Sequence, residues 1–227
     1  MIIALKVGGS VFCPTEKPDT FFAERLAETL RKLSRSHRLV VTVGGGKLAR
    51  KMIESARKKG SKSHERLHKV GIDASRKNAR YLVDILDGAA HPYVPESEEA
   101  VKKAFAGGKI VVTGGFRPGQ TTDTVAMQCA LSVGAELLVI GTDVKGVYTK
   151  DPKKYSDAIF MSEMSPEDLV DMAGTGAVKP GTKTVVDSIA ARMIAENAVK
   201  VAVVDIRDLQ NLESLIAGED FEGTVIG

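Results

Sequence analysis

The stretch LVVTVGGGKLARKMIESARKKG, Leu39 to Gly60, places three consecutive glycines between a β-branched apolar run and a strongly basic segment. A glycine string between a strand and a helix lets backbone N–H groups converge where the helix dipole attracts anions. Two more strings follow apolar runs in the same way, LKVGGSV from Leu5 and VTGGFRPGQTTD from Val112. The sequence therefore predicts three strand-to-helix turns that favour a phosphate-bearing ligand.

Short, nearly continuous apolar runs recur along the chain: IIALKV, LVVTV, AHPYV, KIVVT, ELLVIG and KVAVV. Such runs are typical of strands in a sheet that is covered on both faces. They predict an α/β fold, a largely parallel sheet sandwiched between two layers of helices, with residues 1–227 forming a single domain. In a parallel sheet the carboxyl ends of the strands lie on one edge, so the three turns are expected to share one crevice.

Helices are predicted where apolar residues recur three or four positions apart. One helix presents Phe22, Leu26, Leu30 and Leu33, and another presents Val185, Ile189, Met193 and Ile194. Ser165 is expected to cap a third helix, with Pro166 in its first position. The polar stretch from Lys58 to Lys69 predicts a loop between two helices, which could act as a lid.

Bulk composition narrows the class of protein. Of 227 residues 43% are hydrophobic, and 32 Lys plus Arg against 29 Asp plus Glu give a net charge of +3, so no nucleic-acid or membrane partner is expected. No stretch approaches the roughly 20 apolar residues of a spanning helix, and no leader precedes MIIALKVGG, which predicts a cytoplasmic protein. Cys13 and Cys129 lack metal-ligand spacing, and no protein-held metal site is expected.

Charged residues lie close to the predicted turns. Lys6 ends the first strand, and its ammonium can either snorkel outward or point into the crevice. Lys47, Arg50 and Lys51 lie in the first two turns of a helix, where cations oppose the dipole unless an anion binds. Asp123 lies in the first turn of the helix that follows the third glycine turn and can orient Lys6, an arrangement that suits phosphoryl transfer.

The third glycine turn, after Val112, and the later stretch GTDVKGVYTKDP differ from a phosphate cradle. Thr121 or Thr122 can cap the following helix, and residues 116–120 form a rim that suits a flat polar ligand. Further on, GTDVKGVYTKDP is consistent with a structural hairpin, and it also offers a ring and polar groups suited to a purine at Tyr148, Thr142 and Asp143.

Standard nucleotide motifs fit poorly. Gly44 to Ala49 matches GxGxxA, so an NAD-dependent oxidoreductase is an alternative, but the expected acidic residue at the end of the next strand is missing. A P-loop is absent, because Leu48 follows Gly46-Lys47 and residue 41 is Val. The protein-kinase motifs are absent too, which leaves phosphoryl transfer on another framework, or a nucleotide sensor without activity.

The motifs together resemble the amino-acid kinase superfamily and, within it, the UMP kinases of archaeal type. The likeness runs from LKVGGSV through VTVGGGKLARK, VGIDASRKNA, VVTGGFRPGQTTDTVA and GTDVKGVYTKDP to VVDSIAARMI. It implies a three-layer αβα fold, a homohexamer, and transfer of the ATP γ-phosphate to UMP with Mg²⁺ accompanying the nucleotide. Within the superfamily, other acceptors such as carbamate, an amino-acid carboxylate or isopentenyl phosphate are the nearest alternatives.

The resemblance also implies residue roles. These roles add to Lys6 and Asp123, the catalytic pair expected from charge placement at the turns. The ATP site is expected to contain Gly9, Ser10, Gly46, Arg50, Thr142, Asp143, Tyr148 and Asp151. The UMP site is expected to contain Gly45, His68, Phe116, Arg117, Pro118, Gly119, Gln120, Thr121 and Thr122.

Three positions depart from the family pattern. His68 stands where the family usually has an Asp that binds the UMP ribose, which predicts a pH-sensitive acceptor site. In TDVKGVYT, Asp143 and Lys145 replace the Asn and Asp of the common TNVDGVYT. The adenine contacts are therefore expected to differ in detail from those of the family.

Overall fold

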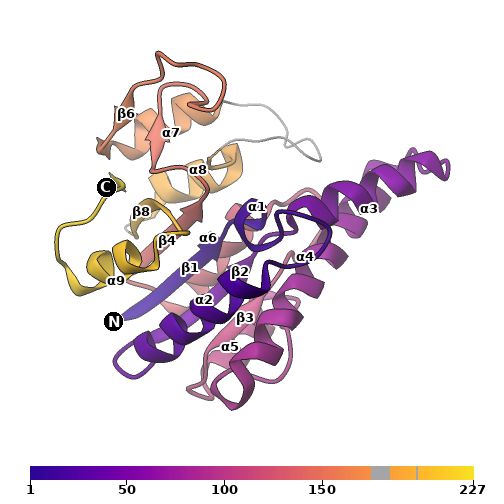
Figure 1. The fold of residues 1–227 in the computed structure, drawn as a ribbon, viewed down its shortest axis with the longest axis horizontal. Coiled ribbons are helices and arrows are strands. Elements are labelled where there is room, and N and C mark those ends of the chain that lie inside the picture. The colour runs from indigo at the N-terminus through magenta and orange to yellow at the C-terminus, as the bar shows by residue number, and fades with distance from the viewer. Residues whose placement is uncertain (175–184, 198) are drawn as a thin grey trace.

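A seven-stranded sheet forms the centre of the computed structural model, which describes residues 1–174, 185–197 and 199–227 (Figure 1). Across the sheet the strands are β3 (Val111–Thr113), β2 (Arg38–Val43), β1 (Ile2–Val7), β4 (Leu137–Thr142), β8 (Lys200–Asp205), β9 (Thr224–Ile226) and β7 (Glu163–Met164). The first five run parallel, whereas β9 runs antiparallel to β8. Five neighbouring strands therefore end on the same edge.

Helices cover both faces of the sheet and complete the predicted three layers. The first face carries α2 (Thr20–Leu33), α4 (His64–Leu86) and α9 (Leu209–Ala217), and the second carries α5 (Glu98–Phe105), α6 (Thr122–Val133), α7 (Pro166–Ala173) and α8 (Ser188–Glu196). Each layer has its own apolar core against the sheet. The largely parallel αβα sandwich predicted from the apolar runs is confirmed.

The alternation of β1 decides where its one charged residue points. Ile3, Leu5 and Val7 belong to the core on the α2 side, and Ala4 belongs to the core on the α6 side. Successive side chains of a strand point to opposite faces, so Lys6 shares the face of Ala4. Lys6 is thereby directed toward α6 at the end of the strand.

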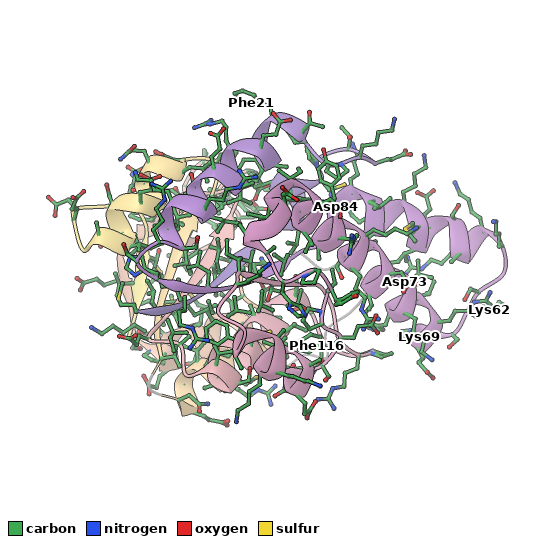
Figure 2. All side chains as sticks on the ribbon, turned by 90° about the horizontal axis from the view of Figure 1, so that it is seen from below. Phe21, Lys62, Lys69, Asp73, Asp84 and Phe116 are labelled. Atoms are coloured by element: carbon green, nitrogen blue, oxygen red, sulfur yellow. The ribbon has the colours of Figure 1, made fainter. Side chains whose placement is uncertain are left out.

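Helices α3 (Gly46–Lys58) and α4 pack along each other and project from the body of the molecule (Figure 1). Figure 2 places Lys62 and Lys69 at the far end of this hairpin. The long polar loop predicted over Lys58 to Lys69 is wrong, because α3 continues through Lys58 and α4 begins at His64. Ser63 caps α4 by accepting a hydrogen bond from the backbone N–H of Arg66 at 3.3 Å, which lets a polar sequence remain helical.

Two other sequence predictions are wrong. AHPYV forms no strand beyond a single bridge between Ala90 and Ile110, because Pro92 and the nearby Pro95 have no N–H group to donate to a neighbouring strand. Val185 lies before α8 rather than in it, since Asp187 caps that helix. The rest of the predicted apolar face, Ile189, Met193 and Ile194, is helical.

Predicted caps and the first apolar helix are confirmed. Ser165 accepts a hydrogen bond from the N–H of Asp168 at 3.1 Å and Pro166 opens α7. All four apolar residues predicted for the first helix are buried in α2.

A short hairpin of β5 (Val147–Tyr148) and β6 (Phe160–Met161) follows β4. Among the described residues, no helix combines the length and apolar character needed to cross a membrane.

Candidate functional site

The turns after β1 and β2 touch one another at the carboxyl edge of the sheet. The backbone N–H of Gly8 donates to the carbonyl of Gly141 at 2.8 Å, and that of Gly44 donates to the carbonyl of Val7 at 3.0 Å. These two N–H groups are therefore used inside the protein and are not free to bind a phosphate. The N–H groups that converge at these turns therefore do not include those of Gly8 and Gly44.

The glycines are required because the two turns approach so closely. A Cβ atom on Gly9 would lie 2.2 Å from the backbone nitrogen of Gly46, and one on Gly46 would lie 2.1 Å from the carbonyl oxygen of Gly9. Gly46 also has a φ of +60°, which disfavours any other residue. The glycine string therefore has a role in packing, because the missing side chains let the two turns come into contact on one rim.

The turn after β3 joins this rim through α4. Asn78 donates from Nδ2 to the carbonyl of Gly44 at 2.8 Å, and Ser75 accepts on Oγ from the N–H of Gly115 at 2.8 Å. One helix therefore holds the second and third glycine turns side by side. Arg76 adds hydrogen bonds from Nε to the carbonyl of Gly115 at 2.9 Å and from Nη2 to that of Phe116 at 3.1 Å.

Lys6 and Asp123 form a buried ion pair at the centre of the rim. Lys6 Nζ lies 2.7 Å from Asp123 Oδ1, and each residue is 8% exposed. Burial raises the pKa of the Asp123 carboxyl, the Lys6 ammonium opposes that rise, and the carboxylate of Asp187 adds to it. The alternative in which Lys6 snorkels outward is excluded.

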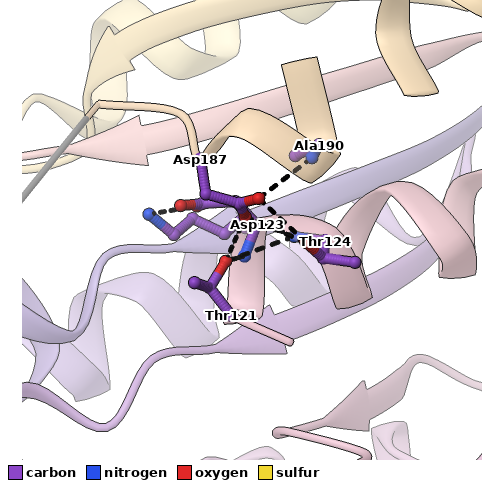
Figure 3. A network of polar contacts seen from close by, with 6 residues as sticks. Thr121, Asp123, Thr124, Asp187 and Ala190 are labelled. Atoms are coloured by element: carbon purple, nitrogen blue, oxygen red, sulfur yellow. Dashed lines mark hydrogen bonds and ion pairs between the residues drawn. The ribbon is translucent and has the colours of Figure 1, made fainter. Parts of the chain in front are cut away.

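Asp187 was not identified from the sequence, yet it lies within the polar network around this pair (Figure 3). Thr121 Oγ1 donates a hydrogen bond to its carboxylate, and Thr124 Oγ1 donates another at 2.9 Å. Its Oδ1 accepts from the N–H groups of Ile189 at 2.7 Å and Ala190 at 3.0 Å. Asp187 thus joins the amino-terminal ends of α6 and α8. The run DSIAAR indicates that Asp187 caps the helix that follows it. The sequence gives no sign that Asp187 also contacts the start of α6.

A cavity of about 330 Å³ opens beside Lys6 at the ends of β1 and β4. Among the residues predicted for ATP, those that line it are Gly9, Ser10, Thr142, Asp143, Tyr148 and Asp151. Gly46 and Arg50 are not lining residues: Gly46 contacts the turn of Gly9, and Arg50 is exposed one turn into α3. We call this space the donor cavity.

Two lysines of the donor cavity were missed by sequence reasoning. Lys150 pairs with Asp157 and Lys153 pairs with Asp143, each at 2.5 Å. The ring of Tyr148 lies 5.4 Å from that of Phe160, which holds it on the β5–β6 hairpin. The signal for the lysines was the TKDPKK run between β5 and β6, but residue spacing did not show that this run lines the cavity.

Residues 116–122 and His68 form a second region, which we call the acceptor wall. Phe116 is buried in the core on the α6 side and Arg117 pairs with Glu98 at 3.2 Å, so both side chains have protein partners. The N–H of Gly119 donates to His68 Nδ1 at 3.4 Å, which joins α4 to the wall. Burial lowers the pKa of His68, and the neighbouring His64 lowers it further.

Gln120 carries a polar atom without a partner in this wall. Its Oε1 is buried and accepts no hydrogen bond from the residues that the structure describes. A buried amide oxygen left unpaired costs about 1–3 kcal/mol, which a ligand donor would recover. Thr121 caps α6 by accepting from the N–H groups of Asp123 at 3.1 Å and Thr124 at 3.4 Å, and Thr122 begins the helix.

The remaining predicted residues are also placed. Gly45 caps α3 and faces α4, where an added Cβ would come 3.5 Å from the backbone nitrogen of Ser75. Gly45 therefore lies against the helix that carries His68. Pro118 is half-buried in the wall. Cys129 is core, and burial raises the pKa of its thiol to about 12.

The chain belongs to the amino acid kinase family, whose model matches residues 1–205. Relatives include the uridylate kinases of Methanosarcina mazei, 38% identical over 96% of this chain and 93% of that protein, and of Methanocaldococcus jannaschii, 42% identical over 90% of each. The crystal structure of uridylate kinase from Archaeoglobus fulgidus aligns with a TM-score of 0.87 and 32% identity, covering 100% of this chain and 99% of the other.

Proposed function

We propose that this protein is a UMP kinase, which transfers the γ-phosphate of ATP to UMP and releases ADP and UDP. The single observation that carries the proposal is the position of the Lys6–Asp123 pair. Lys6 lines the donor cavity, and Asp123 lies in the first turn of the helix whose cap, Thr121, belongs to the acceptor wall. Two phosphate-bearing ligands on this rim would meet beside one buried ammonium.

Residues of the donor cavity would hold ATP. At the start of α1 (Gly9–Phe12), the backbone N–H groups of Gly9 and Ser10 and the Ser10 hydroxyl would bind phosphate oxygens, whereas the N–H groups of Val11 and Phe12 already donate to the Gly8 carbonyl. Tyr148, Thr142 and Asp143 would face the nucleoside, and Asp151 closes the hairpin beside them. Arg50 and Gly46 would reach the phosphates from α3.

Residues of the acceptor wall would hold UMP. The Gln120 amide offers an unpaired acceptor for the uracil ring N–H, and Gly45 offers backbone next to the phosphate. His68 accepts from Gly119 on Nδ1, so its Nε2 carries the proton and can donate to the ribose. A site with matched polar groups rejects bases that leave those groups unpaired.

Catalysis would rest on placement and charge rather than on covalent chemistry. The Lys6 ammonium stabilises the negative charge of the moving phosphoryl group, and Asp123 fixes the ammonium in that position. Apart from the segments 175–184 and 198, no group of three or more His, Cys, Asp or Glu could hold a metal. Mg²⁺ fits this site as a companion of the ATP phosphates, because it keeps water ligands and binds few carboxylates. When bound, it would neutralise phosphate charge.

An oxidoreductase fits the geometry less well. The strand that follows the GxGxxA string, β3, ends at Thr113 and is followed by Gly114 rather than by a carboxylate. Glu65, the acidic residue at the expected distance along the chain, lies in the first turn of α4 and pairs with Lys69 at 2.6 Å. The group that would bind a ribose of NAD is therefore missing from the strand end.

An acceptor panel with ATP and Mg²⁺ tests the proposal. UMP should yield ADP and UDP in equal amounts, while CMP, AMP, carbamate and isopentenyl phosphate should react at least about ten times more slowly. ATP binding without turnover on any acceptor would instead indicate a nucleotide sensor. A homohexamer and a cytoplasmic location are proposed on the family resemblance and the sequence alone, and sedimentation of the purified protein tests the oligomer.

A further inference from the structure

Asp187 connects the two halves of the proposed site. It follows Val185 and Val186, which line the donor cavity, and its carboxylate accepts a hydrogen bond from Thr121 at the end of the acceptor wall. It is 4% exposed. A displacement of the donor side would therefore be carried to the acceptor side through one buried side chain.

The carboxylate of Asp187 is fully occupied by protein donors. Oδ1 accepts from two N–H groups of α8, and Oδ2 accepts from Thr121 Oγ1, from Thr124 Oγ1 at 2.9 Å and from the Thr124 N–H at 3.2 Å (Figure 3). A carboxylate has about four lone-pair sites, so none remains for a ligand or a metal ion. Asp187 acts on the site through other residues.

Asp123 lies between the two threonines that Asp187 holds. Among the residues that the structure describes, the charged groups that act on Asp123 are Lys6 on β1 and Asp187 before α8. The turn of α6 that carries Asp123 is fixed by Thr121 and Thr124, and these two residues are fixed by Asp187. The direction in which the Lys6 ammonium points thus depends on a contact two residues removed from it.

We propose that Asp187 is a positioning residue that locks the Lys6–Asp123 pair in place and couples the donor cavity to the acceptor wall. This inference rests on the proposed UMP kinase activity. It goes beyond that activity because it gives a role in turnover to a buried residue that does not touch the substrates. Asp187 also acts through its charge, because a negative charge near Asp123 favours the protonated form of the Asp123 carboxyl.

The test compares Asp187→Asn with Asp208→Asn in the full-length chain. Asp208 is a matched control, because it caps α9 by accepting from the N–H of Asn211 at 3.0 Å, on the other face of the sheet and outside the donor cavity. The steady-state kcat, the KM for each substrate, the pH profile of kcat and the melting temperature are measured for both variants. Thr124→Val, which removes one donor to Asp187 with little change in volume, serves if Asp187→Asn does not fold.

Asp187→Asn should lower kcat at least about tenfold with a smaller change in the KM for ATP. Loss of the neighbouring negative charge should keep Asp123 ionised to lower pH, which moves the acid limb of kcat down by about 0.5 pH unit or more. Thr124→Val should lower kcat about three- to tenfold. Asp208→Asn should leave the rates and the acid limb unchanged while lowering the melting temperature.

A purely structural cap would not move the acid limb. The inference is overturned if Asp187→Asn matches the Asp208→Asn control in kcat and pH profile, or if Thr124→Val, tested in its place, retains the unmodified kcat. Failure of the proposed function is a separate result. It would appear as absence of UDP formation by the unmodified protein, before any variant is compared.

Discussion

The donor cavity and the acceptor wall are built in different ways. The cavity is formed largely by strand ends and tight turns, with Gly8, Gly9 and Thr142 held by the hydrogen bonds and pairings of the sheet. The wall depends on single side-chain contacts, such as that of His68 with the Gly119 N–H. ATP binding in the donor cavity should therefore tolerate single side-chain substitutions. The selectivity of the acceptor wall for UMP should be sensitive to them.

Replacement of Lys6 should have the largest effect on the rate, because its ammonium serves both the donor cavity and the acceptor wall. Lys6→Ala is expected to lower kcat by about 10²–10³ with a modest change in either KM, since the ammonium acts on the charge of the transition state. Steady-state kinetics with UMP and ATP measure this. A kcat equal to that of the unmodified protein would remove Lys6 from the mechanism.

Replacement of one wall residue should affect the acceptor alone. Gln120→Ala is expected to raise the KM for UMP about tenfold and to narrow the preference for UMP over CMP and AMP, with the KM for ATP unchanged. Kinetics with the three nucleotides measure both effects. Unaltered selectivity would place the choice of acceptor outside Gln120.

The pH dependence of the wall should be traceable to His68. Burial keeps its pKa below the ordinary value, so the ring is neutral at pH 7 and Nδ1 can accept from Gly119. The folded state binds fewer protons than the unfolded state here, so stability and the contact weaken as pH falls below about 6.5. The KM for UMP should rise between pH 7.5 and 5.5.

A non-titrating replacement separates the histidine from the titration of UMP itself. His68→Gln keeps an acceptor near Nδ1 and should show a smaller rise in the KM for UMP over the same pH range. Equal rises in the variant and the unmodified protein would assign the whole effect to the substrate phosphate.

The smallest effect is expected at the edge of the donor cavity. Lys153 is 45% exposed in its side chain and pairs with Asp143, so its charge is partly screened by water. Lys153→Ala is expected to raise the KM for ATP about two- to fivefold with kcat unchanged. A rise in the KM for UMP of the same size would contradict the separation of the two regions.

Much of the fold could be predicted because its signals are local. Apolar runs such as IIALKV and the four buried residues of α2 carry their periodicity in adjacent positions. AHPYV was wrongly predicted as a strand because its apolar residues outweighed the missing N–H group of Pro92. Strands β7 and β9 have two and three residues, too few to show a period.

The site was predictable where it follows strand ends and not where it depends on distant contacts. Lys6 could be directed to Asp123 because the carboxyl edge of the sheet gathers both. The burial of Phe116 and the bridge made by Asp187 each depend on elements far apart in the chain, and the pair of Lys153 with Asp143 depends on how the loop between β5 and β6 folds back. Spacing within one segment contains no information on such pairs.

Inhibition by adenosine and uridine joined through four or five phosphates tests the central claim most directly, namely that donor and acceptor meet beside Lys6. If both sites share one rim, the compound should bind once per chain and compete with ATP and with UMP alike, and Lys6→Ala should weaken it. Competition with only one of the two substrates would contradict the account.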